Sequence, residues 1–177
     1  QTDHLDTWQL HNVKRQDDLD KIFANDGAMK ALLQAKDEGL VRCLGVTGHY
    51  EPLILKQFLD RFDFDTILLA VNAADPHYLS FKKYLLPKAQ EKGVGIIGMK
   101  LATRGRMLST WTPPPIEEQS KQMATKLAGT ITIKETLEYN FTLPVSTNII
   151  GIDNIAQIEE NAKIASEFSN LNEEQMA

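Results

Sequence analysis

Short runs of apolar residues alternate along the chain with segments in which apolar residues recur at every third or fourth position. The short runs predict buried strands over residues 5–10, 40–46, 66–71, 94–99 and 146–150. The segments with helical spacing predict helices over residues 17–39, 52–62, 78–92 and 131–141. A last helix is predicted to begin at Asp153 or Asn154 and to carry Ile155, Ile158, Ala162 and Ala165 on one face.

Glycine and proline residues mark the boundaries of these elements. Residues 25–27 interrupt the first helical segment, and Gly39 can close it with a left-handed cap. Pro52 suits the first turn of a helix, and Pro87 is predicted to divide the segment 78–92 into two pieces. Residues 103–129 show no clear periodicity and contain three consecutive prolines, which predicts an active-site lid or a mobile loop.

Five strands that each lead into a helix predict an α/β fold with a parallel sheet covered by helices. Two architectures fit this order: an open doubly wound sheet, or part of a (β/α)8 barrel. A complete barrel has eight such units and about 250 residues. The 177 residues of this chain are therefore expected to form either an open five-stranded sheet or a piece of a barrel.

Composition narrows the classes of function. The fractions of hydrophobic residues (42%) and charged residues (24%) are ordinary for a globular protein, which argues against disorder. The net charge is −5, so we expect neither a nucleic-acid nor a membrane partner. The single Cys43 excludes an internal disulfide framework and a zinc or iron–sulfur site built from several cysteines. We expect a cytoplasmic location, since no apolar run approaches the roughly 20 residues that span a bilayer and no signal peptide precedes the first strand.

Residues 93–98 match the dinucleotide-binding pattern G-x-G-x-x-G, but their position argues against that function. The pattern binds pyrophosphate only when it follows a strand and opens a helix. Here a helix precedes Gly93, and Gly95 and Gly98 lie inside the predicted strand. We therefore interpret Gly93 as a helix cap and the other two glycines as small residues at crowded strand positions.

Three histidines follow predicted strands, where parallel sheets bind their ligands: His11, His49 and His77. Together with Asp75 they could form a metal site or an acid–base site. On the first strand, Thr7, Gln9 and His11 share one face. That polar face suits either the interior of a barrel or a solvent-facing edge strand.

A second polar group follows the fourth strand. Lys100, Arg104 and Arg106 flank Gly105, and clustered cations on a glycine-containing loop are suited to bind phosphate or pyrophosphate. The alternative is a solvated loop without a ligand.

Five motifs occur along the chain: W-Q-L-H-N (8–12), R-C-L-G-V-T-G-H (42–49), V-N-A-A-D-P-H-Y (71–78), G-I-I-G-M-K (95–100) and I-I-G-I-D-N-I-A-Q-I-E-E-N (149–161). In this order and spacing, from about residue 5 to residue 164, they resemble the aldo/keto reductase superfamily. The resemblance is greatest to the branch with the G-V-T-G-H and M-K motifs, some members of which carry a ferredoxin-like segment. It implies that residues 1–177 form a single domain, comprising strands four to eight of a (β/α)8 barrel. It also implies an oxidoreductase that reduces a small-molecule carbonyl substrate with NADP or NAD.

The resemblance assigns roles to individual residues. His11 matches the catalytic histidine that orients the substrate carbonyl. The positions that match the cofactor site are Thr47 and Gly48 for the carboxamide, Met99 for the nicotinamide face, Lys100, Thr103, Arg104 and Arg106 for the pyrophosphate, and Asp153, Asn154, Gln157 and Asn161 for the adenosine end. No metal is implied. Gln157 stands where NADP-preferring members often have Arg, which leaves NADP and NAD both open.

The sequence also departs from the family pattern. The catalytic Asp, Tyr and Lys of the family would lie on the first three strands, which this sequence lacks, so we expect a fragment that is inactive in isolation. Its edges, residues 5–10 and 146–150, would then be open, which predicts an incomplete chain, a homo-oligomer or loops that cover the edges. Two other functions stay open: a metal-dependent barrel hydrolase using His11, His49, His77 and Asp75, and a non-catalytic nucleotide-binding module.

Overall fold

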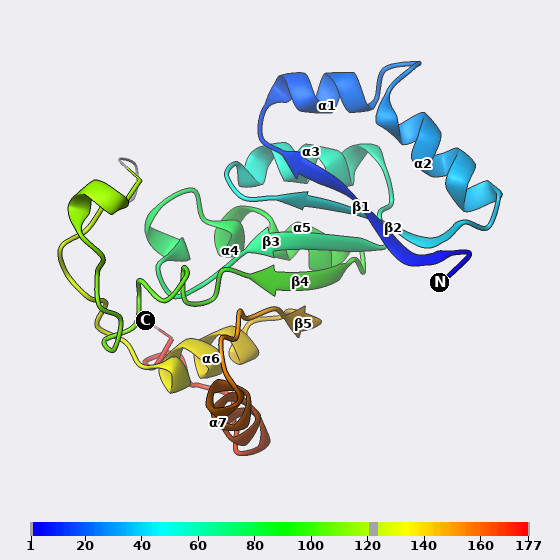
Figure 1. Ribbon diagram of the computed structural model, residues 1–177. Helices are drawn as coiled ribbons and strands as arrows, with labels where there is room; N and C mark the ends of the chain where they lie inside the picture. Colours follow the sequence, from blue (N-terminus) through cyan, green and yellow to red (C-terminus); the bar gives the residue numbers. More distant parts are fainter. Residues whose placement is uncertain (1, 121–123, 177) are drawn as a thin grey trace.

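The computed structural model describes residues 2–120 and 124–176, and within them five parallel strands form one sheet (Figure 1). The strands are β1 (Leu5–Val13), β2 (Val41–Gly48), β3 (Thr66–Ala70), β4 (Gly95–Met99) and β5 (Thr147–Asn148), and they lie side by side in chain order. Each strand pairs in parallel with the next. The predicted α/β fold with a parallel five-stranded sheet is therefore confirmed.

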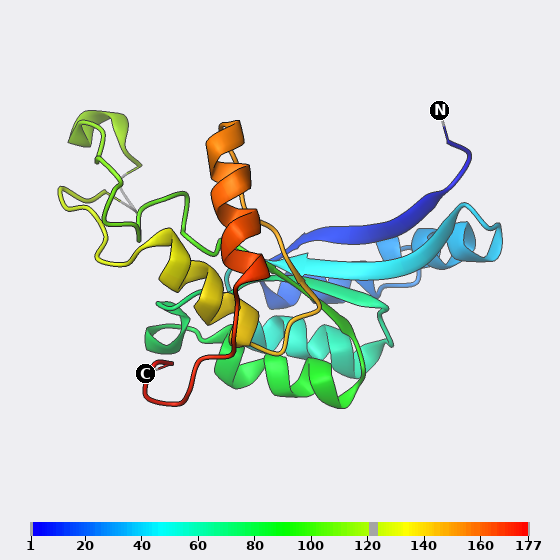
Figure 2. The same ribbon diagram turned by 90° about the horizontal axis from the view of Figure 1, so that it is seen from below.

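The two faces of the sheet differ in burial. The face that carries Leu44, Val46, Ile67 and Leu69 is inaccessible to solvent. It packs against α3 (Pro52–Arg61) and α5 (Leu86–Glu91), which lie along one side of the sheet (Figure 2). On the opposite face, Gln9, Thr66, Leu68 and Ile97 are only half-buried. The sheet is thus covered by helices on one face, and Gln9 lies on the other, as the alternation in the first strand predicts.

The helices begin and end where local chemistry favours it. In α1 (Gln16–Ile22), Asp18 accepts hydrogen bonds from the backbone N–H groups of Lys14 (2.8 Å) and Arg15 (3.0 Å). Gly39, with φ of +73°, follows the end of α2 (Ala28–Asp37), as predicted. Pro52 opens α3, and Glu51 accepts a hydrogen bond from Leu53 N–H (3.2 Å).

The segment predicted as a broken helix over residues 78–92 begins later than expected. It consists of α4 (Phe81–Tyr84) and α5, with Pro87 in the first turn of α5, so the predicted break is present. The residues before α4 form the short 3-10 helix η1 (Asp75–His77) and an irregular turn in which Leu79 has φ of +43°. Asp75 fixes this arrangement because it accepts hydrogen bonds from Ser80 Oγ (2.6 Å), Phe81 N–H (2.8 Å) and Lys82 N–H (3.0 Å).

The last two units differ from the sequence prediction in their boundaries and packing. The ladder that holds β5 runs from the Ser146 N–H to the Ile149 N–H, which donate to Ile96 O (2.8 Å) and Gly98 O (2.7 Å). The helix predicted here is α7 (Ile155–Ser166), and the face that carries Ile155, Ile158, Ala162 and Ala165 is exposed. The helix packs instead on α6 (Ile133–Thr142), where the buried Ile164 joins a small cluster with Leu137 and Leu101.

Residues 103–129 are irregular apart from a 3-10 helix, η2 (Ile116–Glu118), in the part that is described. A parallel bridge between Leu108 and Ile131 closes the base of the segment. The Gln119 side chain joins two parts of the segment by donating to Pro114 O (2.7 Å) and accepting from Thr125 N–H (2.9 Å). Residues 121–123 lie outside the described part, and a lid function stays a prediction.

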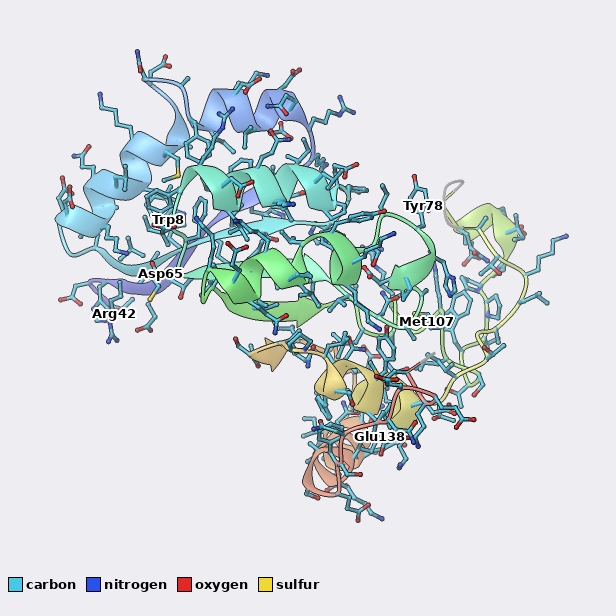
Figure 3. The ribbon with its side chains drawn as sticks, turned by 180° about the vertical axis from the view of Figure 1, so that it is seen from behind. Trp8, Arg42, Asp65, Tyr78, Met107 and Glu138 are labelled. Atoms are coloured by element: carbon cyan, nitrogen blue, oxygen red, sulfur yellow. The ribbon has the colours of Figure 1, made fainter. Side chains whose placement is uncertain are left out.

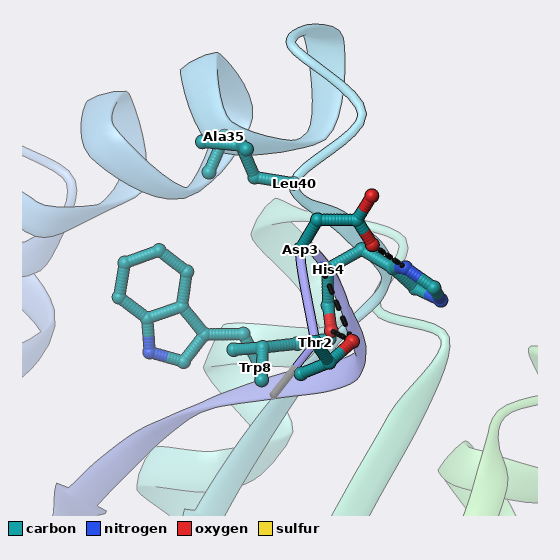
Figure 4. A pocket seen from close by; sticks show the side chains of 7 residues that line it. Thr2, Asp3, His4, Trp8, Ala35 and Leu40 are labelled. Carbon is teal, nitrogen blue, oxygen red and sulfur yellow. Dashed lines mark hydrogen bonds and ion pairs between the residues drawn. The ribbon is translucent and has the colours of Figure 1, made fainter.

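A hollow of about 250 Å³ lies beside the start of β1 (Figure 4). Its walls are the apolar side chains of Trp8, Ala35 and Leu40 and the polar groups of residues 2–4, which bond to one another. It is therefore at the amino end of the strands, away from the edge where parallel sheets bind ligands. In the described ranges, no helix has the length and apolar character to cross a membrane.

Candidate functional site

The carboxyl ends of β1, β2 and β4 meet at one edge of the sheet, because the strands are parallel and adjacent or nearly so. His11 lies near the end of β1, His49 directly follows β2, and Lys100 directly follows β4. This edge therefore brings together three of the polar positions that the sequence singles out.

His11 and His49 are neighbours at this edge. Their ring centroids are 5.8 Å apart and the ring planes are nearly perpendicular, at 86°. Burial lowers the pKa of His49, and the positive charges of Lys100, His11 and Lys14 lower it further. A lowered pKa favours the neutral imidazole of His49 near pH 7.

The end of β2 carries a buried hydroxyl with no partner in the described structure. Thr47 is 1% exposed, and its Oγ1 has no hydrogen-bond partner within the described residues. Such a group is costly unless a ligand or water satisfies it. Next to it, a Cβ at Gly48 would lie 2.7 Å from Leu55 Cδ1 and 2.9 Å from Val13 O, so the close packing here requires glycine.

The loop that follows β4, residues 100–106, has an unusual backbone. Lys100, Thr103, Arg104 and Gly105 all have positive φ, between 51° and 83°. Hydrogen bonds from Thr103 N–H to Lys100 O (2.9 Å) and from Arg106 N–H to Thr103 O (3.3 Å) close the turns. We refer to residues 100–106 as the 100–106 loop. Backbone of this kind can aim N–H groups outward and is suited to hold an anion.

Arg106 carries a second buried donor without a partner. Its guanidinium lies 5.9 Å from the centre of the Trp111 ring, and its Nη1 is buried with no acceptor in the described part of the chain. Met99, which precedes the loop, is 8% exposed. An anion at the 100–106 loop would satisfy the guanidinium.

The residues matched to the adenosine end lie at the start of α7. Asn154 caps the helix by accepting a hydrogen bond from Gln157 N–H (3.1 Å), and the Gln157 side chain accepts one from Asp153 N–H (2.7 Å). The structure brings these three residues together, and Asn161 follows one turn along the helix. Their contact with a nucleotide stays a prediction.

The proposed metal site is not formed by the four residues grouped in the sequence. Asp75 is buried, and its carboxylate oxygens accept hydrogen bonds from Ser80, Phe81 and Lys82, so its role is structural. In residues 2–120 and 124–176, no three His, Cys, Asp or Glu side chains are placed to hold a metal ion. The alternative of a metal-dependent hydrolase on these residues was wrong for this reason.

The G-x-G-x-x-G pattern lies where the sequence analysis placed it. Gly93 has φ of +66° just after α5, and Gly95 and Gly98 belong to β4. A Cβ at Gly98 would collide with the Asn148 side chain. Gly93 therefore ends a helix and Gly98 allows close packing in the strand, so the pattern does not form a phosphate-binding turn.

Sequence reasoning missed two features of the site: the ring contact between His11 and His49, and the unpartnered Thr47 hydroxyl. The pairing of β1 with β2 accounts for the first, since Val13 pairs with Gly48 and His49 therefore follows directly beside the end of β1. Nothing in the sequence indicates the second, because it depends on what surrounds one atom.

The model of the aldo/keto reductase family matches residues 1–177. The chain belongs to the aldo/keto reductase family. One relative is the L-galactose dehydrogenase of Arabidopsis thaliana, which is 29% identical over 188 residues, covering 99% of this chain and 57% of that protein. Another is the uncharacterized oxidoreductase YqkF of Bacillus subtilis (strain 168), 21% identical, with 93% of this chain and 56% of that protein covered.

Solved structures agree with this membership at the level of the fold. The holo form of the aldo-keto reductase AKR11C1 from Bacillus halodurans superposes with a TM-score of 0.71 at 22% identity, covering 99% of this chain and 57% of that one. The glycerol dehydrogenase AKR11B4 from Gluconobacter oxydans gives a TM-score of 0.58 at 15% identity, covering 97% and 62%. This aldo/keto reductase chain thus spans between half and two thirds of the length of the relatives and structures named here.

Proposed function

We propose that this chain forms strands four to eight of an aldo/keto reductase barrel, and that the protein carrying it reduces a carbonyl compound with NADPH or NADH. One observation carries the proposal: within the described residues, two buried donors, Thr47 Oγ1 and Arg106 Nη1, have no hydrogen-bond partner. Thr47 lies at the carboxyl end of β2, and Arg106 lies in the loop that follows the carboxyl end of β4. Buried polar groups in native proteins are satisfied by protein, water or ligand, so these two atoms are available to a polar ligand at this edge.

A nicotinamide dinucleotide fits the residues that are present. Thr47 and Gly48 would hold the carboxamide, and Met99 would cover the nicotinamide face. Lys100, Thr103, Arg104 and Arg106 would hold the pyrophosphate, and the start of α7, with Asp153, Asn154, Gln157 and Asn161, would bind the adenosine end. When bound, the dinucleotide supplies the hydride for the carbonyl carbon.

His11 has the central role among the residues of this chain. We assign it to donate a hydrogen bond to the substrate carbonyl oxygen, which orients the carbonyl and stabilises the negative charge that develops on the oxygen. The half-buried face with Gln9 and Thr66, which are joined by a side-chain hydrogen bond of 3.4 Å, would line the interior of the barrel beneath that oxygen. The family's tyrosine proton donor has no counterpart that we assign in this chain.

Arg106 provides the sharpest test of the nucleotide site. We expect Arg106→Met to weaken binding of NADPH and NADH at least about tenfold, because it removes a charge-assisted contact to the pyrophosphate. The matched control is Arg42→Met, because Arg42 is exposed and pairs with Asp6 at 3.0 Å. Figure 3 shows Arg42 at the opposite end of the molecule from Met107, the residue that follows Arg106 in the sequence.

The assay is isothermal titration calorimetry on the protein that carries this chain, with both nucleotides. Arg42→Met should bind within about twofold of the wild type. Equal affinity in Arg106→Met, or no binding of either nucleotide by the wild type, would contradict the proposal. Binding without reduction of any carbonyl would favour the non-catalytic nucleotide-binding module.

A further inference from the structure

Four neighbouring side chains line the carboxyl ends of β1 and β2. The His11 and His49 rings lie 5.8 Å apart, the His49 and Tyr50 rings 6.3 Å apart, and Lys14 Nζ lies 5.4 Å from the centre of the Tyr50 ring. Tyr50 is 57% exposed, so the group is open to a ligand. We call these four residues the rim cluster.

The rim cluster carries the positive charge of Lys14, and Lys100 adds a second one nearby, although the chain has a net charge of −5. Lys100 and Lys14 act on His49 as positive charges, and no carboxylate is among the groups that shift the pKa of His49. Within the described residues, neither Lys14 nor Lys100 forms an ion pair.

Acidic side chains on the neighbouring elements accept hydrogen bonds from backbone N–H groups. Asp18 of α1 accepts from the N–H groups of Lys14 and Arg15, and Glu51, at the start of α3, accepts from Leu53 N–H. Neither carboxylate lies within ion-pair distance of Lys14, so the Lys14 ammonium has no anionic partner among the described residues. A ligand with a negative charge would supply one.

We propose that the rim cluster binds a carboxylate carried by the carbonyl substrate, so that the protein acts on oxo acids in preference to neutral ketones and aldehydes. This inference rests on the proposed function, because it assigns His11 to the carbonyl oxygen. In a 2-oxo acid, the carbonyl and carboxylate carbons are adjacent, so the neighbouring imidazoles of His11 and His49 can each form a hydrogen bond to one of the two groups. His11 donates to the carbonyl oxygen, while Lys14 and His49 bind the carboxylate. His49 takes up a proton from solvent when the anion binds, because the carboxylate offsets the burial and the positive charges that favour its neutral form.

The kinetic test compares two substrates with the same four-carbon skeleton, 2-oxobutyrate and 2-butanone. With the protein that carries this chain, we expect kcat/KM to be at least about tenfold higher for the acid. Lys14→Met and His49→Phe should each lower the ratio of the two kcat/KM values at least about fivefold. Lys30→Met, an exposed lysine of α2, is the control and should leave the ratio unchanged. A ratio near one in the wild type, or an unchanged ratio in Lys14→Met and His49→Phe, would overturn the inference.

A binding measurement separates this inference from the proposed function, since it needs no turnover. Titration of the His49 imidazole by nuclear magnetic resonance should show that 2-oxobutyrate raises the pKa of His49, because a bound anion stabilises the protonated ring, and that 2-butanone does not. This result without any reduction would support carboxylate binding by the rim cluster but reject both the proposed reductase function and the substrate preference. Reduction of carbonyls without the pKa change would reject the inference alone. If adenosine 5′-diphosphate raises the pKa of His49 and abolishes the effect of 2-oxobutyrate, the cluster holds cofactor phosphate and the inference fails.

Discussion

Replacement of Asp75 by alanine tests whether this residue is structural. The carboxylate is 9% exposed and accepts three hydrogen bonds, from Ser80 Oγ (2.6 Å), Phe81 N–H (2.8 Å) and Lys82 N–H (3.0 Å). Ser80 is itself 3% exposed, so water cannot readily replace the lost acceptor. At about 1 kcal/mol for each bond, Asp75→Ala should lower the free energy of unfolding by about 3 kcal/mol.

Urea denaturation followed by far-ultraviolet circular dichroism measures this loss. With an m value of about 2 kcal/mol/M, the midpoint should fall by about 1.5 M while the slope stays unchanged. Asp75→Asn keeps an acceptor oxygen, and we expect it to lose about half as much. The control is Asp63→Ala, because the Asp63 side chain is 92% exposed and its ion pair with Lys92 should contribute about 0.5 kcal/mol or less. If Asp75→Ala were as stable as the control, the structural role would be refuted and a functional role for Asp75 would return.

Three further predictions follow from the same contacts. Gly48→Ala should lower the free energy of unfolding by about 1–3 kcal/mol in thermal or urea unfolding, because the new Cβ would lie 2.7 Å from Leu55 Cδ1. Gly151→Ala is the control and should be neutral, because the space around Gly151 is open. Equal effects of the two substitutions would contradict the packing argument. Because the pKa of His49 is lowered in the folded state, the unfolded state binds more protons as the pH falls through about 6.5. The free energy of unfolding of the wild type should therefore fall relative to that of His49→Phe between pH 7.5 and pH 5. Equal changes of this free energy with pH in the two proteins would refute the prediction. Thr132→Ala should cost about 1 kcal/mol in urea unfolding near pH 7, because Thr132 Oγ1 accepts from Glu135 N–H (3.1 Å) and donates to the Glu135 carboxylate (2.8 Å). The backbone and side chain of Thr132 lower the pKa of Glu135, and only the bond to the carboxylate weakens on protonation, so the cost should decrease, without vanishing, as the pH drops below about 4.5; a cost that did not change with pH would contradict the assignment.

The alternation of apolar runs and helical spacing was sufficient to predict the sheet. The residues of β3 and β4 that the pattern marks as core, such as Ile67, Leu69 and Ile96, are buried, and the strands are adjacent in chain order. The pattern could not predict what each helix packs against. In α7 it marked Ile155 and Ile158 as one apolar face, but that face is exposed because α7 packs on α6 through Ile164.

The candidate site was predicted in its location but not in its contacts. The positions of His11, His49 and the 100–106 loop follow from the ends of the strands, which sequence patterns can identify. The structural role of Asp75 could not be predicted, because it depends on three donors five to seven residues further along a turn without regular dihedral angles. The unpartnered Thr47 and Arg106 donors depend on the surroundings of single atoms, which no sequence pattern encodes.

The central claim is that the carboxyl edge of this sheet holds a nicotinamide dinucleotide beside His11. A crystal structure of the protein that carries this chain, grown with NADPH, tests the claim most directly. We predict the pyrophosphate on the 100–106 loop in contact with Arg106, the carboxamide at Thr47 Oγ1, and the nicotinamide ring within reach of a carbonyl held by His11. A nucleotide bound at another place, or one that leaves both Thr47 and Arg106 without a partner, would contradict it.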